Sequence, residues 1–380
     1  MRKLKLIGGS IVAVLLLAAC SDSLDQSTLN PAGPVAQKQE DLFQFVFWLA
    51  VAVFVVVEGA LVLFVWKYRH RPGAKPSGVH GNTKLEIGWT IAPAVLLAVI
   101  TVPTITGIWD LAETPTGPDV IQVDVVGHQW WWEFRYPDQE LVTANELVIP
   151  TGTQISIRLC AAGASGAANP KTANPDGGVG PQASGPALGA PCVDPAPNLG
   201  NAVIHAFWVP RLAGKQDVVP GRTNEMYLSA DEPGLYPGQC AEYCDWSHAN
   251  MRFQVKAVSP EEFSAWLTEQ QAEAAVPGAG SLADKGMQDF ANGSCIGCHA
   301  IKGVEGAAAV QGPDLTHFAS RDCFAGCMFP TYNEDGSFNA EAMKAWLEDP
   351  PAVKPGSWMP NYHLKPDEVE ALIAYLQSLT

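Results

Sequence analysis

The chain has 380 residues, of which 47% are hydrophobic, and it carries a formal net charge of −16. Its length allows two or three domains. The acidic balance argues against nucleic-acid binding and favours a basic protein partner or plain solubility. Most of the N-terminal third is apolar, and the nine cysteines suit an oxidising compartment or metal and cofactor chemistry.

The first twenty residues have the pattern of an export signal. A basic start at residues 2–5 precedes an apolar stretch at 7–19. The sequence Leu-Ala-Ala-Cys that ends at Cys20 resembles a bacterial lipobox, in which Cys20 would be lipidated and residues 1–19 removed. The alternative is an ordinary membrane anchor with a chance cysteine.

Two apolar stretches, 42–66 and 85–109, are each long enough to span a bilayer, and a polar leader at 20–41 precedes them. The basic loop 67–84 between them is expected on the cytoplasmic side, which places the rest of the chain outside. Glu58 lies within the first span. A carboxylate there is costly unless it faces protein or water, so this helix is expected to pack on another membrane subunit.

Short strands are predicted in the stretch 117–268. The segments 121–125, 154–159 and, more loosely, 226–228 alternate apolar and polar residues, and turns rich in Pro and Gly separate them. This pattern predicts a β-sandwich or barrel.

An insert at 161–201 is rich in Ala, Gly and Pro and is expected to be a surface loop. Cys160 and Cys192 flank most of it. In an exported protein, a Cys160–Cys192 disulfide would close this loop.

One loop, residues 238–251, concentrates ligand-type side chains, and a further histidine lies upstream of it. Soft sulfur ligands combined with imidazole favour copper over hard cations. The alternative is a Cys240–Cys244 disulfide with an incidental histidine and methionine. The candidate ligands are His205, Cys240, Cys244, His248 and Met251.

The stretches 203–210, 214–217, 220–222 and 238–251 resemble subunit II of the haem–copper cytochrome c oxidases. The resemblance implies a cupredoxin fold, a Greek-key sandwich that holds CuA, a two-copper centre bridged by both thiolates. The implied ligands are His205, Cys240, Cys244, His248, Met251 and the backbone carbonyl of Glu242.

The resemblance also implies roles outside the copper ligands. Trp130 would receive electrons at the surface above CuA, and Glu86 would lie at the mouth of a proton-uptake path into subunit I. The Glu242 carboxylate would help to bind a magnesium ion shared with subunit I, as a hard ligand suits. The alternative for Glu86 is a carboxylate that marks the membrane edge. Of the neighbouring tryptophans, Trp131 and Trp132 are expected in a buried cluster.

A second redox site is predicted in the C-terminal part, 281–380. The sequence Cys295-Ile296-Gly297-Cys298-His299 is a c-type haem attachment motif, in which the cysteines bond to the haem and His299 is the proximal ligand. A redox dithiol or a zinc knuckle is the alternative. A helix capped by Ser259 ends the sandwich, and a linker at 269–280 follows. Helices are expected over the ranges 281–291, 340–348 and 365–379.

A cytochrome c of the electron-transfer kind needs a sixth iron ligand, for which methionine is suited. Met359 lies on a Pro-flanked loop that resembles the methionine loop of class I cytochromes c, and it is preferred to Met328. Met287 is too close to the motif in sequence, and Met343 is expected in the core. By elimination Cys323 and Cys327 pair with each other; a third metal site with His317 is the alternative.

The sequence thus predicts a multidomain membrane protein with a two-helix transmembrane hairpin, an all-β cupredoxin-like Greek-key sandwich and an all-α cytochrome c domain. The predicted function is that of oxidase subunit II in a bacterial inner membrane, with its soluble domains outside. The expected partners are subunit I, other oxidase subunits and a donor, either cytochrome c or a cytochrome bc complex. The alternatives are a CuA subunit of a nitric oxide reductase and a membrane-anchored electron carrier.

Overall fold

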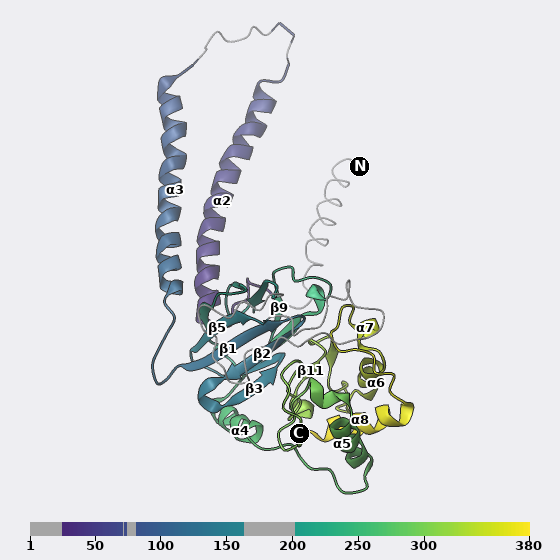
Figure 1. Ribbon diagram of the computed structural model, residues 1–380. Coiled ribbons are helices and arrows are strands. Elements are labelled where there is room, and N and C mark those ends of the chain that lie inside the picture. Colours follow the sequence, from purple (N-terminus) through teal and green to yellow (C-terminus); the bar gives the residue numbers. More distant parts are fainter. Residues whose placement is uncertain (1–24, 71, 74–80, 163–201) are drawn as a thin grey trace.

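The computed structural model describes residues 25–70, 72–73, 81–162 and 202–380. Two long helices extend from one side of a β-sandwich, and a mainly helical domain lies against another side (Figure 1). The predicted lipidation site Cys20 and the predicted disulfide partner Cys192 lie outside the described residues.

The two membrane helices are α2 (Pro34–Lys67) and α3 (Thr83–Ala112). Both are longer than the predicted spans. Residues 34–41, expected in the leader, form the first turns of α2 because Pro34 suits the start of a helix and Val35 and Ala36 are buried against the sandwich. The Ala36 amide also donates to the Leu212 carbonyl at 3.2 Å, which ties the start of the span to the sandwich.

Both helices are long and apolar enough to cross a membrane. Their large apolar side chains are exposed along most of their length; Val56 is 70% exposed and Trp109 is 71% exposed. Faces of this size and composition are covered by lipid or by other membrane subunits. The chain is a membrane protein with two spans.

The sandwich consists of two five-stranded sheets, with strand orders β3-β2-β1-β5-β8 and β4-β10-β9-β6-β7. The first sheet contains β1 (Ile121–His128), β2 (Trp131–Tyr136), β3 (Leu141–Ala144), β5 (Ile155–Ala161) and β8 (Asn224–Leu228). The second contains β4 (Glu146–Pro150), β6 (His205–Trp208), β7 (Gln216–Val218), β9 (Gly234–Cys240) and β10 (Arg252–Val258). Both sheets mix parallel and antiparallel pairs, with β1 parallel to β5 and β4 parallel to β10.

The alternation predicted for the first strand does not separate a buried face from an exposed face. Asp124, a polar position of β1, is 1% exposed and accepts a hydrogen bond from Arg158 of β5 at 2.6 Å. Parallel pairing of β1 with β5 places these two residues side by side. Asp124 is therefore buried in an ion pair with the half-buried Arg158 of the neighbouring strand.

The helical domain follows α4 (Pro260–Gln270), which Ser259 and Glu262 cap reciprocally as predicted from the sequence. It contains α5 (Leu282–Asn292), α6 (Ala340–Glu348), α7 (Pro350–Val353), α8 (Pro366–Ser378) and the short strands β11 (Cys323–Phe324) and β12 (Phe329–Pro330). Helices α5 and α8 cross closely: a Cβ at Gly286 would lie 2.0 Å from the Ala371 carbonyl oxygen. Glycine is required at this crossing.

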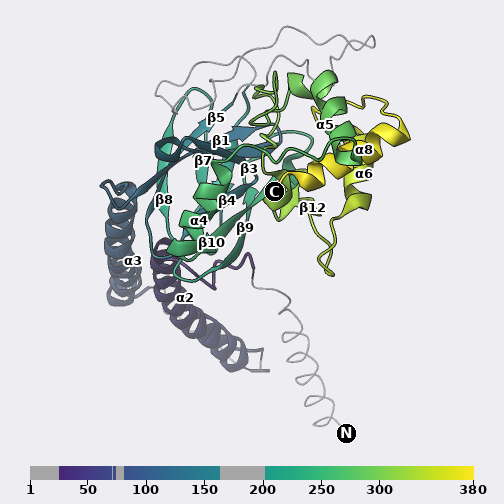
Figure 2. The ribbon, with the colours of Figure 1, turned by 90° about the horizontal axis from the view of Figure 1, so that it is seen from below.

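The helical domain contacts the sandwich directly, as the view from below also shows (Figure 2). The Arg252 amide donates to the Gly326 carbonyl at 3.2 Å, and the Asp322 amide donates to the Glu146 carboxylate at 3.1 Å. Lys256 pairs with Asp322 at 2.9 Å. We call residues 322–327, which make these contacts, the docking loop.

Candidate metal and haem sites

The predicted copper ligands meet where strands β6 and β9 pair at one end of the sandwich. His205 is the first residue of β6, and Cys240 is the last residue of β9. Cys240 pairs with Phe207, and the Ala241 amide donates to the Ala206 carbonyl at 2.9 Å. The strand register therefore brings the distant His205 to the loop that carries the other ligands.

Cys240 and Cys244 form the centre of the cluster. The Cys240 Sγ lies 3.8 Å from the Cys244 Sγ and 3.8 Å from the His205 Nδ1. The Cys244 Sγ lies 3.6 Å from the His248 Nδ1 and 3.8 Å from the Met251 Sδ. Each sulfur thus has one imidazole nitrogen beside it, and the two sulfurs face each other.

The donor set fits a thiolate-bridged copper pair. Cys240 and Cys244 are free thiols, and the 3.8 Å between their sulfurs exceeds the S–S bond length of about 2.05 Å. Metal–sulfur bonds of about 2.3 Å can bridge that gap. Both cysteines and Met251 are buried, so these soft donors are shielded from water. The Cys240 Sγ also lies 3.2 Å from the Glu242 carbonyl oxygen, the remaining predicted ligand.

The thiols hold each other in different protonation states. A hydrogen bond from the Cys244 thiol, opposed by burial and reinforced by His205, lowers the pKa of Cys240 to about 3. The same contact raises the pKa of Cys244, because a second thiolate so close would be repelled. A bound cation removes this repulsion and stabilises both thiolates. Without a metal ion, the protein thus favours the thiolate form at Cys240 but not at Cys244.

Trp130 lies directly against the ligand loop. Its Nε1 donates to the Cys244 carbonyl at 2.7 Å, and the Gln129 side chain donates to the same carbonyl at 3.2 Å. The resemblance implied a tryptophan at the surface, but Trp130 is only 3% exposed because the helical domain covers it. Trp132 is fully buried as expected, whereas Trp131 is half-buried and stacks on His128.

The haem-attachment motif lies on a single turn that begins in the short helix Ser294–Gly297. The amides of Cys298 and His299 both donate to the Cys295 carbonyl, at 3.1 Å and 3.0 Å. The His299 Nδ1 lies 2.8 Å from the Pro313 carbonyl oxygen. Donation to that carbonyl leaves Nε2 as the nitrogen available to a metal. Burial lowers the pKa of His299, which favours the neutral, ligating imidazole.

The four methionine candidates for the sixth iron ligand differ in environment. Met343 is 1% exposed in the helical core, as expected. Met287 and Met359 are half-buried and pack against the same core cluster. The Met328 amide donates to the Phe324 carbonyl at 3.2 Å, which places it at the end of the docking loop. Met359 remains the predicted ligand.

The structure describes one of the two predicted cysteine pairs in full and one partner of the other. Cys323 and Cys327 form a disulfide within the docking loop. Cys160, at the end of β5, is disulfide-bonded. Since Cys192 lies outside the described residues, the Cys160–Cys192 pairing stays a prediction.

The predicted acidic residues of the spans are exposed on the isolated chain. Glu86 lies in the first turn of α3, where its carboxylate accepts from the Asn82 amide at 3.2 Å. Glu58 lies on the surface of α2. Both side chains are therefore placed where another membrane subunit could contact them.

Two residues that sequence reasoning missed lie beside Trp130. Trp358 stacks on it, with ring centroids 6.3 Å apart, and the Lys354 Nζ donates to the Trp130 carbonyl at 2.6 Å. For Trp358 the signal was its position directly before Met359 in the methionine loop. For Lys354 the sequence carried no comparable signal.

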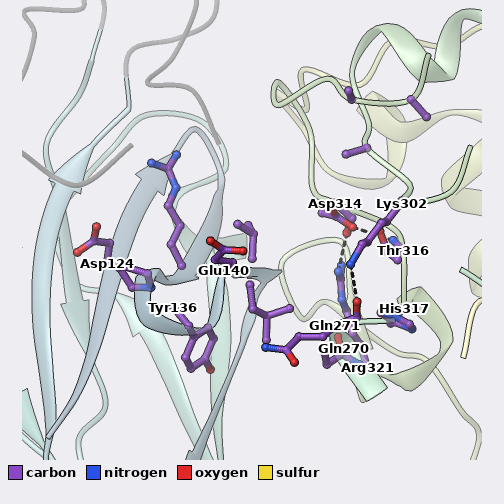
Figure 3. A pocket seen from close by; sticks show the side chains of 17 residues that line it. Asp124, Tyr136, Glu140, Gln270, Gln271, Lys302, Asp314, Thr316, His317 and Arg321 are labelled. Carbon is purple, nitrogen blue, oxygen red and sulfur yellow. Dashed lines mark hydrogen bonds between the residues drawn. The ribbon is translucent and has the colours of Figure 1, made fainter. Parts of the chain in front are cut away.

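A cavity of about 560 Å³ lies between the sandwich and the helical domain (Figure 3). Tyr136 and Glu140 line it from the sandwich, and Lys302, His317 and Arg321 line it from the helical domain. None of the predicted copper or haem ligands is among the described residues that line it. This cavity is therefore separate from the two redox sites.

A cupredoxin-like domain with a cysteine–histidine metal site, joined to a cytochrome c domain and two membrane helices, defines a membrane-bound redox protein. Three family models match the chain. They are cytochrome c oxidase subunit II, transmembrane domain, at residues 23–106; its periplasmic domain at 199–258; and cytochrome c at 283–380. These families indicate CuA in the sandwich and haem c in the C-terminal domain.

The whole chain resembles curated oxidase subunits. It is 37% identical over 372 residues to cytochrome c oxidase subunit 2 of Alkalihalophilus pseudofirmus, covering 96% of this chain and 94% of the relative. It is 31% identical to the Bacillus subtilis protein of the same name, with the same coverage. The chain belongs to the cytochrome c oxidase subunit II family, with a fused cytochrome c domain.

Other similarities cover less of the chain. The quinol oxidase subunit 2 of Bacillus cereus is 30% identical over 264 residues, which is 68% of this chain and 77% of the relative. The solved periplasmic domain of cytochrome oxidase subunit II from Bradyrhizobium japonicum has 23% identity and a TM-score of 0.30, over 42% of this chain and 97% of that chain.

Proposed function

We propose that the chain is the electron-accepting subunit of a cytochrome c oxidase, in which electrons pass from its own c-type haem to CuA and then to subunit I. The observation that carries the proposal is the position of Trp130, bonded to the Cys244 carbonyl on one side and covered by the cytochrome domain on the other. When bound, the two groups supply one-electron redox chemistry. Reduction of oxygen to water and proton pumping are assigned to subunit I.

The ligand loop would hold the two copper ions through the thiolates of Cys240 and Cys244. His205 and His248 would each bind through Nδ1, the nitrogen that faces a sulfur at 3.8 Å and 3.6 Å respectively. Met251 and the Glu242 carbonyl would complete the set. Burial of the sulfurs keeps the site rigid and dry, which limits the rearrangement that each electron transfer requires.

The cytochrome domain would hold the haem through thioether bonds to Cys295 and Cys298. His299 would bind the iron through Nε2, because its Nδ1 faces the Pro313 carbonyl. Met359 would be the second protein ligand of the iron and would raise its potential. The electron donor would be a soluble cytochrome c or a cytochrome bc complex.

The remaining residues are assigned to the contact with the membrane and with subunit I. Glu86, exposed at the start of α3, would lie at the entrance of the proton path. The Glu242 carboxylate would bind magnesium together with ligands from subunit I. Lipidation at Cys20 would anchor the mature N-terminus on the outer side of a bacterial inner membrane, where both soluble domains would also lie.

The complete set of copper ligands favours an oxidase of cytochrome c over a quinol oxidase, since soft sulfur and imidazole donors have no role without copper. The two spans with exposed acidic residues favour a subunit of a membrane complex over a free electron carrier, for which one anchor would suffice.

The proposal is tested by metal and optical analysis of the purified chain and its Met251→Leu variant. We expect two coppers and one haem per chain, a near-infrared copper band and a low-spin c-haem spectrum. Met251→Leu should alter the copper band and leave the haem spectrum unchanged, because the methionine lies 3.8 Å from Cys244 in the other domain. A chain with haem but without copper would remove the main support for the proposal.

A further inference from the structure

Residues 354–358 form a junction between the two domains. Trp358 packs against the core cluster of the sandwich, whereas its neighbour Met359 packs against the core cluster of the cytochrome domain. The side chains of these two adjacent residues thus pack against different domains. On the sandwich side, the Trp358 ring stacks on Trp130 with an interplanar angle of 21° and 6.3 Å between ring centroids.

Trp130 in turn contacts the loop that carries the proposed copper ligands. Its Nε1 donates to the carbonyl of Cys244, one of the copper ligands proposed above, at 2.7 Å. The covalent bond from Met359 to Trp358, the ring stack and this hydrogen bond form one continuous series from the methionine loop to Cys244. Each member of the series is buried or half-buried, so no solvent layer has to be crossed.

The junction is held in one arrangement by close contacts. The Lys354 Nζ is buried and donates to the carbonyls of Trp130 and Ala325, at 2.6 Å and 3.2 Å. Gly356 has a φ of +85°, and a Cβ there would lie 3.0 Å from the Trp130 ring and 2.9 Å from Trp246. Only glycine fits this conformation and this approach without displacement. The ring stack is therefore specified by its supporting residues.

We propose that Trp358 is the residue through which electrons leave the cytochrome domain for Trp130 and the copper loop. This inference rests on the proposed function. One electron leaves the reduced haem, and one electron reduces the oxidised copper centre; both tryptophans have the same oxidation state before and after, and no proton moves. Trp358 contributes its conjugated ring, placed against the ring of Trp130.

The test uses the full chain in its oxidase complex, loaded with haem and copper, with Trp358→Leu, Trp358→Phe and the matched control Trp346→Phe. Trp346 is also half-buried in the cytochrome domain. It packs against the core of that domain, whereas Trp358 packs against the core of the sandwich. An electron is injected at the haem by a light-activated ruthenium complex, and reoxidation of the haem and reduction of the copper are followed optically. Equilibrium spectra and potentials of both centres are measured on the same samples.

Trp358→Leu is expected to slow the transfer on the order of tenfold, as loss of a positioned contact does in a geometry-dependent step. Trp358→Phe should be slowed less, and Trp346→Phe should match the wild type. Spectra and potentials of both centres should stay unchanged. A Trp358→Leu rate equal to the wild-type rate would overturn the inference.

Docking of the domains is measured separately by hydrogen exchange at the Arg252 amide, which donates to the Gly326 carbonyl across the interface. If the rates of both Trp358 variants fell only in proportion to faster exchange at Arg252, Trp358 would be a packing residue and the inference would be wrong. Failure of the proposed function would look different, since the wild type would then lack copper, haem or any transfer between them.

Discussion

At the scale of single residues, the least expected feature is the buried carboxylate of Glu133 on β2. It lies 2.7 Å from the His128 Nε2 and is also bonded to the Arg135 guanidinium. Burial raises its pKa, but the hydrogen bond from His128 and the charges of His128 and Arg135 outweigh burial and hold the pKa at about 2. The group therefore stays ionised inside the sandwich.

Because of this carboxylate, the stability of the sandwich should depend on pH. Its pKa in the folded protein is about 2, below the ordinary value of 4.5. This difference contributes on the order of 3 kcal/mol to the free energy of unfolding. That contribution is present above pH 4.5 and is lost as the pH falls from 4.5 towards 2. Glu133→Gln should lower the denaturation midpoint of the sandwich at pH 7, and the difference from wild type should shrink towards pH 2.

Glu261→Gln, at an exposed position of α4, is the matched control and should behave as wild type at every pH. Chemical denaturation followed by tryptophan fluorescence measures both variants. Equal midpoints for Glu133→Gln and wild type at pH 7 would contradict the stabilising role of the ion pair.

At the scale of elements, the docking loop, which contains β11 and ends just before β12, is the main polar contact of the cytochrome domain with the sandwich. Its Cys323–Cys327 disulfide closes a short loop, and the Cys327 Sγ lies 3.5 Å from the Asn145 carbonyl oxygen. The carbonyl of Gly326, within that loop, accepts the Arg252 amide. The crosslink therefore restricts the segment that fixes one domain on the other.

Removing the crosslink is expected to loosen the docking loop without affecting either set of metal ligands. Closure of so short a loop contributes about 2 kcal/mol in the chain-entropy description. The double variant Cys323→Ser, Cys327→Ser should show faster hydrogen exchange at the Arg252 amide and unchanged copper and haem spectra. Unaltered exchange at that amide would show that the loop is held by its other contacts alone.

At the scale of the whole molecule, the cytochrome domain occupies the position above Trp130. A soluble donor therefore has no direct access to this tryptophan, which is only 3% exposed. The two domains belong to one chain, so their effective concentration relative to each other does not depend on the concentration of the protein. The proposed electron transfer between the domains would therefore take place within one chain.

The rate of electron transfer between two domains of one chain should not depend on ionic strength. Salt screens exposed charges but has little effect on buried contacts such as the Trp130–Trp358 stack. Flash-induced transfer from haem to copper should have the same rate at low and high salt. Reduction of the haem by added cytochrome c, measured by stopped flow, should slow at high salt because it depends on electrostatic steering. A strongly salt-dependent internal rate would mean that the domains must separate and rebind.

The local features were readable from the sequence, whereas the contacts between domains were not. The ligands from Cys240 to Met251 lie on one loop, and the capping residues Ser259 and Glu262 are three residues apart, so spacing alone predicted both. The Lys354–Trp130 bond joins residues 224 positions apart in two domains with unrelated periodicity. Hydrophobic patterning reports burial within an element but does not specify which foreign surface covers it.

The start of the first membrane helix was misplaced for a similar reason. Val35 and Ala36 are buried by the sandwich rather than by lipid, so the hydropathy of the span alone did not mark the beginning of α2.

The cover over Trp130 also changes where donor specificity can evolve. A copper domain with an open tryptophan must keep its own surface complementary to every donor it accepts. On the proposed route, a soluble donor would meet the free faces of residues 281–380 and not Trp130, so a change of donor would require changes on those faces. The loop with the proposed copper ligands would not have to change with the donor.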